Sequence, residues 1–314
     1  MKRPNYMVGL KIGVTLIAIV AIVKQVDLAA VADTLTLFPI SSIPFILGFL
    51  TVGLAASALK WQVILKGLGR PVAFASLVRL AWVGLFFNTF LPGRTGGDIV
   101  RAWSLAASDS NRLRSFASVA VDRAANLFAL VLLGSVATLI DPRIPEELVV
   151  FVRTLALVSI IGLFGFLALR RKAMQYLPQK VQELLRTLDT GRWCSRRIAA
   201  VVTLAVVFQT VVVLINIVAA RGLQIPVTST ALFVVVPLTA IVTAIPISIN
   251  GFGIREAAYA TILSYVGAGP EVAVALSLTV TTAMIAWSLG GGACFVFSTV
   301  APRKTELVGE SRAV

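Results

Sequence analysis

The chain has 314 residues, of which 58% are hydrophobic and only 13% are charged. Soluble proteins average about 25% charged residues, so this composition excludes a soluble globular protein and predicts a polytopic helical membrane protein. The net charge of +14 does not indicate nucleic-acid binding, because Lys and Arg lie mainly between apolar segments, as they do in the cytoplasmic loops of membrane proteins.

The sequence offers little for catalysis. It contains no histidine, which removes His-based acid–base chemistry, His metal sites and Ser-His triads. Cys194 and Cys294 have neither the spacing of a metal site nor that of a disulfide framework. We therefore expect no enzymatic activity, no metal and no cofactor. An enzyme that acts on lipid headgroups through Asp98, Glu256 and an arginine remains a minor alternative.

Apolar segments follow one another along the chain. The first could be a signal peptide, but its length favours an uncleaved span. We expect six full spans, at 7–26, 38–59, 115–140, 148–169, 198–220 and 272–300, and shorter apolar segments at 73–91, 231–245 and 256–267. Residues 170–197 hold eight Lys or Arg residues and two acidic ones, with apolar residues at helical spacing. This segment is either an inner-leaflet helix that senses anionic lipid or an ordinary basic loop.

The charges between segments predict the topology. Basic residues after the second span (Lys60, Lys66 and Arg70) indicate a cytoplasmic loop, and the acidic loop at 141–147 indicates an external one. Both termini are then cytoplasmic. Because basic loops also flank 73–91, that segment is predicted to be a re-entrant hairpin that turns at 92–97, a backbone tolerated only when buried in protein or lining a wet cavity. The five tryptophans mostly flank spans and are interpreted as interfacial anchors.

One polar pattern occurs twice. Pro92, Gly97 and Arg101 are repeated, at a common displacement, as Pro246, Gly251 and Arg255. Halves 1–147 and 148–300 each consist of two spans, a hairpin and a span, and they start on opposite sides of the membrane. The predicted fold is therefore an all-α polytopic membrane protein with six full spans and two re-entrant helical hairpins in an inverted-topology repeat. Residues 1–300 would form one transmembrane domain, followed by a polar tail at 301–314.

The repeated pattern is suited to an anion. Pro92 and Pro246 break the helices and free backbone N–H groups, and the half-helices that follow present N-terminal dipoles to a group such as phosphate. Glycines permit close approach, arginines add fixed charge, and asparagines supply amide contacts. The predicted headgroup-binding residues are Asn88, Arg94, Gly96, Gly97, Arg101, Asn250, Gly251 and Arg255.

Charge pairing is the competing interpretation. Asp98 and Glu256 could neutralise nearby arginines, so that the charged residues lock the two hairpins together or open and close as a gate. Asp122 and Arg123 are adjacent on a helix and therefore face different directions. We expect Arg123 to face the first hairpin, and the alternative is packing against the bilayer surface. Asp98, Asp122, Arg123 and Glu256 are thus the predicted gating or charge-pairing residues.

Three patches together resemble a known family: the stretch from Asn88 to Arg101, the pair Asp122-Arg123, and the stretch from Pro246 to Glu256. They are similar to the lysylphosphatidylglycerol synthase transmembrane family, which includes the flippase domain of the multiple peptide resistance factor. The resemblance implies a bacterial or archaeal inner-membrane protein that translocates or handles lipids. It does not imply aminoacyl transfer, because in bifunctional members a separate soluble domain performs that chemistry.

We therefore expect a lipid flippase or transporter that acts on an anionic lipid. Without a Walker-type phosphate-binding motif, the 314 residues have no ATPase of their own. The alternative is a non-transporting lipid-binding partner of a membrane glycosyltransferase or of another lipid-synthesis enzyme.

Overall fold

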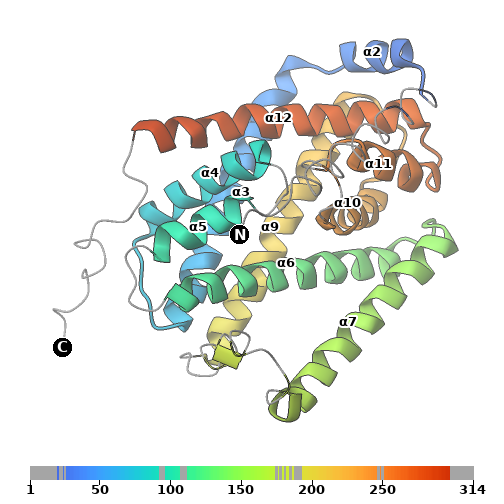
Figure 1. The fold of residues 1–314 in the computed structure, drawn as a ribbon. Coiled ribbons are helices and arrows are strands. Elements are labelled where there is room, and N and C mark those ends of the chain that lie inside the picture. The colour runs from blue at the N-terminus through green and yellow to red at the C-terminus, as the bar shows by residue number, and fades with distance from the viewer. Residues whose placement is uncertain are drawn as a thin grey trace.

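The computed structural model describes residues 20, 24, 26–91, 96–106, 112–173, 176, 179, 182–183, 186, 193–245, 248 and 251–297. These residues form ten α-helices and one short 3-10 helix, and they contain no strand (Figure 1). The predicted all-α class is confirmed. The predicted first span, the C-terminal tail and most of the predicted surface helix lie outside the described residues.

The helices agree with the apolar segments of the sequence. They are α2 (Leu28–Thr36), α3 (Ile43–Gly67), α4 (Phe74–Phe90), α5 (Gly96–Ala106), α6 (Arg112–Ile140), α7 (Glu146–Ala173), α9 (Ser195–Gly222), α10 (Ser229–Ala244), α11 (Ile254–Ser264) and α12 (Pro270–Phe297), and η1 (Ile40–Ser42) is the 3-10 helix. In the described chain, four stretches are long and apolar enough to cross a membrane: η1 with α3, α6, α9 and α12. Helices α4 and α10 are shorter apolar helices. The arrangement of six spans with two re-entrant hairpins stays a prediction.

Helix α2 lies between the predicted first and second spans. Its N-terminus is capped by the Asp27 side chain, which accepts hydrogen bonds from the backbone N–H groups of Ala29 and Ala30. Val31 is then buried in the core between helices of the second half. Asp27 therefore acts as a helix N-cap.

The two halves repeat in three dimensions. Helices α9 to α12 start about 155 residues after α3 to α6, pair by pair. Helix α3 packs on α9, α4 packs on α12, and α10 packs on α6, which is the pattern expected when a pseudo-twofold axis exchanges the halves. Helices α6 and α12 run in opposite directions in Figure 1. These observations agree with the predicted inverted repeat.

The core of the first half surrounds Trp61. This residue is fully buried among α3, α4, α5 and α6, and its indole N–H donates to the Ser118 hydroxyl at 2.9 Å. In addition, Trp82 stacks on Trp287, with ring centroids 5.1 Å apart. The interpretation as interfacial anchors is therefore wrong for Trp61, whose ring is a core side chain.

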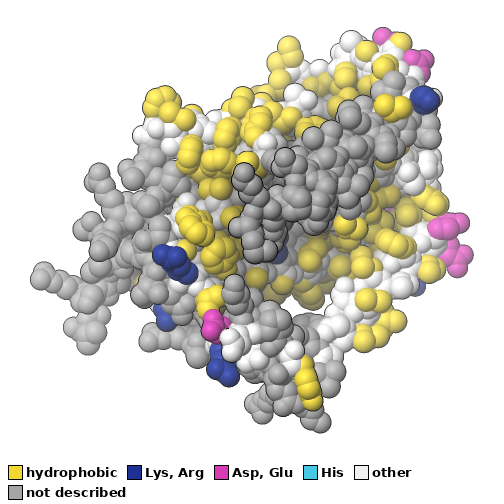
Figure 2. All heavy atoms as spheres, in the orientation of Figure 1, with side chains coloured by type: hydrophobic (Ala, Val, Ile, Leu, Met, Phe, Trp, Pro, Cys, Tyr) yellow, Lys and Arg dark blue, Asp and Glu magenta, His cyan; other side chains and the backbone are white. Residues whose placement is uncertain are grey.

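The described surface matches a membrane protein. Figure 2 shows apolar side chains over much of the visible face, with Asp and Glu gathered mainly at its right edge and Lys and Arg mainly at the lower left. Large apolar side chains such as Phe151, Val158 and Ile161 on α7 are exposed to the surroundings. This surface would be costly in water and is suited to lipid.

Candidate functional site

The first repeated motif leads into α5, which lies beside α4. The Asn88 side chain, in the last turn of α4, accepts a hydrogen bond from the backbone N–H of Gly97 at 2.8 Å. Asn88 thus caps the first turn of α5, and the N–H of Gly97 is already satisfied within the protein. The predicted roles of Asn88 and Gly97 in headgroup binding stay predictions.

Glycines bring α4 and α5 into backbone contact. A Cβ on Gly97 would lie 1.7 Å from the carbonyl oxygen of Gly84, and a Cβ on Gly84 would lie 2.7 Å from Cγ of Arg101. A Cβ on Gly96 would lie 2.8 Å from that of Leu91. These glycines are needed for helix packing, which in turn positions the Arg101 side chain against α4.

Helix α5 carries two members of a buried ionic cluster. Asp98 and Arg101 are one turn apart on its buried face, and their Oδ1 and Nη2 atoms are 2.9 Å apart. The other carboxylate oxygen of Asp98 accepts hydrogen bonds from the guanidinium of Arg123 on α6. Arg123 therefore faces the first hairpin, as predicted, and Asp98 pairs with both arginines.

Two further members come from α6 and α3. Asp122 lies 3.4 Å from Nη2 of Arg101 and 3.1 Å from Nζ of Lys60. Lys60 also donates a hydrogen bond to Oδ1 of Asn126, one turn after Asp122 on α6. As predicted, the adjacent residues Asp122 and Arg123 have different partners. We call Lys60, Asp98, Arg101, Asp122 and Arg123 the charge cluster.

The charge cluster holds three cations and two carboxylates. Lys60 is completely buried, the side chains of Asp98, Arg101 and Asp122 are almost completely buried, and that of Arg123 is 46% exposed. The guanidinium of Arg101 lies over the Trp61 ring, 4.8 Å from its centroid, and its Nε has no hydrogen-bond partner among the described residues. Four members of the cluster are therefore buried, and Arg123 is the member that reaches the surface.

Sequence reasoning missed Lys60. It placed this residue in a cytoplasmic loop after a span that ended at 59, whereas α3 continues to Gly67 and buries the lysine. Arg70 was assigned to the same loop, yet it is also buried and donates to Ser115 and to the carbonyl of Leu105. Hydropathy alone ends a span at the first charge and cannot see a partner on a distant helix.

In the second motif, the charged residues Arg255 and Glu256 form hydrogen bonds to uncharged groups, unlike those of the charge cluster. Gly251 and Gly253 have φ angles of 80° and 78°, a region that favours glycine. Glu256 accepts hydrogen bonds from the Gly253 N–H at 2.7 Å and from the Ser277 hydroxyl at 2.9 Å. Arg255 donates to the Thr281 hydroxyl at 2.6 Å. The carboxylate of Glu256 therefore caps α11 and ties it to α12.

The two motifs lie on separate parts of the bundle. Helix α5 packs on α4 and α6, whereas α11 packs on α10 and α12, and the two lie toward opposite sides of Figure 1. The hairpin tips, with the predicted residues Pro92, Arg94, Pro246 and Asn250, fall outside the described residues. The described geometry brings together Arg101, Asp98, Asp122 and Arg123, but it does not bring Arg255 or Glu256 into this group.

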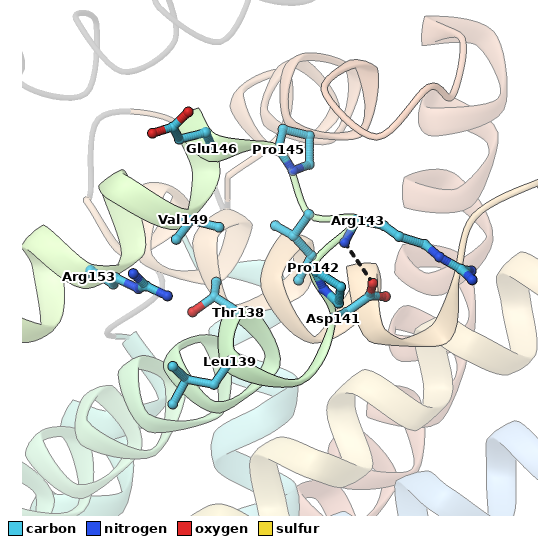
Figure 3. A pocket seen from close by; sticks show the side chains of 10 residues that line it. Thr138, Leu139, Asp141, Pro142, Arg143, Pro145, Glu146, Val149 and Arg153 are labelled. Carbon is cyan, nitrogen blue, oxygen red and sulfur yellow. Dashed lines mark hydrogen bonds between the residues drawn. The ribbon is translucent and has the colours of Figure 1, made fainter.

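A cavity of about 600 Å³ lies elsewhere, where α6 turns into α7 (Figure 3). Its lining includes Thr138, Asp141 and Arg153 but none of the predicted site residues. Asp141 accepts hydrogen bonds from the Thr230 hydroxyl and from the backbone N–H of Arg143, and these bonds lower the pKa of its carboxyl. The lining around Asp141 is thus the connection between α6 and α7, and the Asp141 side chain stabilises its turn.

Comparisons with known proteins agree with the arrangement of helices and motifs. The family model of the lysylphosphatidylglycerol synthase transmembrane region matches residues 7–289. A UPF0104 membrane protein of Pyrococcus horikoshii is 33% identical over 85 residues, which are 26% of this chain and 25% of that protein. The chain therefore aligns with about a quarter of that relative's length. The resemblance inferred from the three sequence patches is confirmed.

Proposed function

Since this chain belongs to the lysylphosphatidylglycerol synthase transmembrane region family, we propose that it is a flippase or transporter for an anionic lipid of the cytoplasmic membrane. In this proposal it is not an enzyme, and both of its termini face the cytoplasm. Its substrate is recognised by the negative charge of the headgroup, while the acyl chains remain in the bilayer.

One observation carries the proposal: with all three of its cations protonated, the charge cluster has an excess of one positive charge, and it reaches the surface at Arg123. A buried excess charge costs several kcal/mol unless it is compensated. An anionic headgroup beside Arg101 and Arg123 would supply that compensation. Guanidinium groups suit this role because they bind phosphate oxygens in bidentate geometry. The buried Nε of Arg101, which lacks a partner among the described residues, adds a donor to the site.

The bonds inside the cluster suggest how the site is maintained when it is empty. Asp98 holds Arg101 and Arg123 together through its two carboxylate oxygens. A phosphate that arrives at the exposed side of Arg123 competes with Asp98 for the same donors. The carboxylate then acts as an internal substitute for the substrate, and it re-forms both pairs after the lipid leaves.

The repeat supports a route for movement. In transporters with inverted repeats, one half rocks against the other, and access alternates between the two sides of the membrane. Helices α3 and α9 occupy equivalent positions in the two halves and pack on each other, so their contact is suited to serve as the pivot. The second motif would line the opposite access route, with Arg255 held by Thr281 until it contacts the headgroup.

The proposal is tested in proteoliposomes with a fluorescent phosphatidylglycerol and a membrane-impermeant quencher. The protein should expose the inner-leaflet label faster than empty vesicles do. Arg123→Gln should slow this by about tenfold or more, because a charge-assisted hydrogen bond contributes about 1.5–3 kcal/mol. Arg153→Gln, at an exposed arginine outside the cluster, is the matched control.

Two outcomes would redirect the proposal. Equal rates with and without protein, for several anionic lipids, would refute transport by the chain alone. Tight lipid binding without movement, together with co-purification of a lipid-modifying enzyme, would favour the alternative function as a lipid-holding partner of that enzyme.

A further inference from the structure

We propose that Lys60 takes up a proton when the anionic headgroup binds and releases it when the headgroup leaves, so that lipid handling is coupled to protons. This inference rests on the proposed function and adds the coupling ion to it. The atom that changes is Nζ of Lys60: a solvent proton adds to its lone pair as the anion arrives.

The charge balance of the cluster singles out this residue. Arg101 and Arg123 remain protonated at any physiological pH, and together they offset the two carboxylates. The charge on Lys60 is therefore the excess charge. Among the three cations, lysine is the one that can lose its proton when buried, and its side chain has no exposed surface.

The surroundings of Lys60 act on its charge in opposite senses. Burial opposes the charged form, and the like charges of Arg101 and Arg123 in the same cluster oppose it too, whereas the Asp122 carboxylate stabilises it at 3.1 Å. From α9, the Phe208 ring lies 5.2 Å from Nζ and adds a weak attraction. A bound anion offsets the positive charge of the two arginines and so weakens their repulsion of a protonated Lys60. Protonation of Lys60 and binding of the anion therefore favour each other.

The hydrogen bonds of Lys60 suit both of its states. Nζ donates to Oδ1 of Asn126 and lies 3.1 Å from Oδ1 of Asp122, an oxygen that accepts no hydrogen bond among the described residues. A neutral amine retains two N–H groups, so the bond to Asn126 does not depend on the extra proton. The cluster reaches the surface at Arg123, whose side chain is 46% exposed. Arg123 pairs with Asp98, Asp98 with Arg101, Arg101 with Asp122, and Asp122 with Lys60, so a continuous series of ion pairs joins the surface to Lys60.

A static role for Lys60 gives a different expectation. If the lysine only stabilises Asp122 and remains charged throughout, anion binding exchanges no proton with solvent. If it titrates, binding takes up as much as one proton per anion, as linkage requires. The number of protons exchanged therefore separates the two roles directly.

The experiment is isothermal titration calorimetry of the detergent-purified full chain with dihexanoyl phosphatidylglycerol, in buffers that differ in ionisation enthalpy. This phosphodiester carries a permanent negative charge and takes up no proton itself near neutral pH. The wild type should take up as much as one proton per bound lipid over part of the range from mildly acidic to alkaline pH. Lys60→Arg should bind the lipid with essentially no proton uptake, and Lys66→Arg, an exposed lysine on the same helix, should behave as the wild type does.

The proton uptake of the wild type tests the coupling even if the Lys60 variants fail to fold. Binding with no proton uptake at any pH would overturn the coupling and leave the proposed function standing. Uptake that persists unchanged in a folded Lys60→Arg or Lys60→Gln protein would also overturn it, because the proton would then reside elsewhere. Failure of the wild type to bind the probe or any other anionic lipid would refute the proposed function and the coupling with it.

Discussion

Asp98→Asn isolates the part that a single carboxylate plays in the charge cluster. The amide has nearly the same shape as the carboxylate and keeps one acceptor oxygen, but it loses the negative charge. Asp98 pairs with Arg101 at 2.9 Å and with Arg123 through its other oxygen. The substitution therefore leaves both guanidinium groups in place with half of their compensating charge removed.

The expected loss of stability follows from the burial of each pair. The Asp98–Arg101 pair is almost completely buried, and breaking such a pair costs about 3–5 kcal/mol, here at the lower end because asparagine still accepts a hydrogen bond. Arg123 is 46% exposed, so loss of the Asp98–Arg123 pair contributes at most about 1 kcal/mol to the loss of stability. The total is about 3–4 kcal/mol. Asp33→Asn, at an exposed aspartate on α2, should change stability by less than about 0.5 kcal/mol.

The free energy of unfolding in mixed micelles, measured for a double-mutant cycle, tests this reasoning. Arg101→Met removes the guanidinium, and in the double variant with Asp98→Asn the buried charge that lacks a partner is removed with it. The double variant should therefore be more stable than the sum of the single effects allows, by about 1–3 kcal/mol. Lipid binding gives an independent measurement: without the competing carboxylate, the Asp98→Asn protein should bind dihexanoyl phosphatidylglycerol more tightly.

The two measurements separate neutralisation from ligand contact. Additive single effects, or a loss no larger than that of Asp33→Asn, would refute the argument that Asp98 compensates buried arginines. A large coupling energy with unchanged or weaker lipid binding would show that the arginines only neutralise the aspartates. In that case the headgroup would have to bind elsewhere.

Three further predictions concern the scaffold. Gly97→Ala should abolish or strongly reduce the folded yield in size-exclusion chromatography, because its Cβ would lie 1.7 Å from a carbonyl oxygen of α4, whereas Gly48→Ala, with open space around it, should be tolerated. Gly253→Ala should lower the free energy of unfolding by about 1–3 kcal/mol, because residues with a side chain sparsely populate its backbone conformation of φ 78° and ψ −52°. Asp141 should contribute stability above its ordinary pKa of 3.8 and lose it as the pH falls through the lower value of the folded state, since the hydrogen bond from Thr230 depresses that pKa. The difference in thermal stability between the wild type and Asp141→Asn should therefore shrink on acidification.

Local patterns in the sequence predicted the all-α class and most of the described helices. Apolar runs and helix-breaking glycines gave every described helix from α3 to α12, and the displaced skeleton of proline, glycine and arginine gave the correspondence between the halves. Local sequence patterns could not predict the pairing of Lys60 with Asp122, because this pairing depends on how α3 packs on α6. One signal was present: Asp122 and Asn126 are four residues apart, so they share a helix face that needs a donor.

The same limit applies to the half-helix termini. Sequence reasoning left the N–H groups that follow each helix break free for a phosphate. In the structure, the Asn88 side chain satisfies one of them at Gly97, and Glu256 satisfies another at Gly253. The Asn88 cap depends on the close packing of α4 on α5, and the Glu256 cap depends on the positive φ of Gly253. The amino-acid types alone predict neither feature. The proposed attraction for an anion therefore rests on the side-chain cations more than on these two N–H groups.

The cations are distributed unequally between two halves that share one arrangement of helices. Helix α5 contacts α6 through Asp98 and Arg123, whereas α11 contacts α12 through Glu256 and Ser277. In the second half, α11 and α9 are joined by a neutral bond from the Tyr259 hydroxyl to Asn216, and no ionic cluster corresponds to that of α3, α5 and α6 among its described residues. A pseudo-symmetric scaffold can rock between two equivalent shapes, but an anion experiences different fields on its two sides. Under the proposed function, this asymmetry puts the stronger anion site in the first half, and the second half moves as its counterpart.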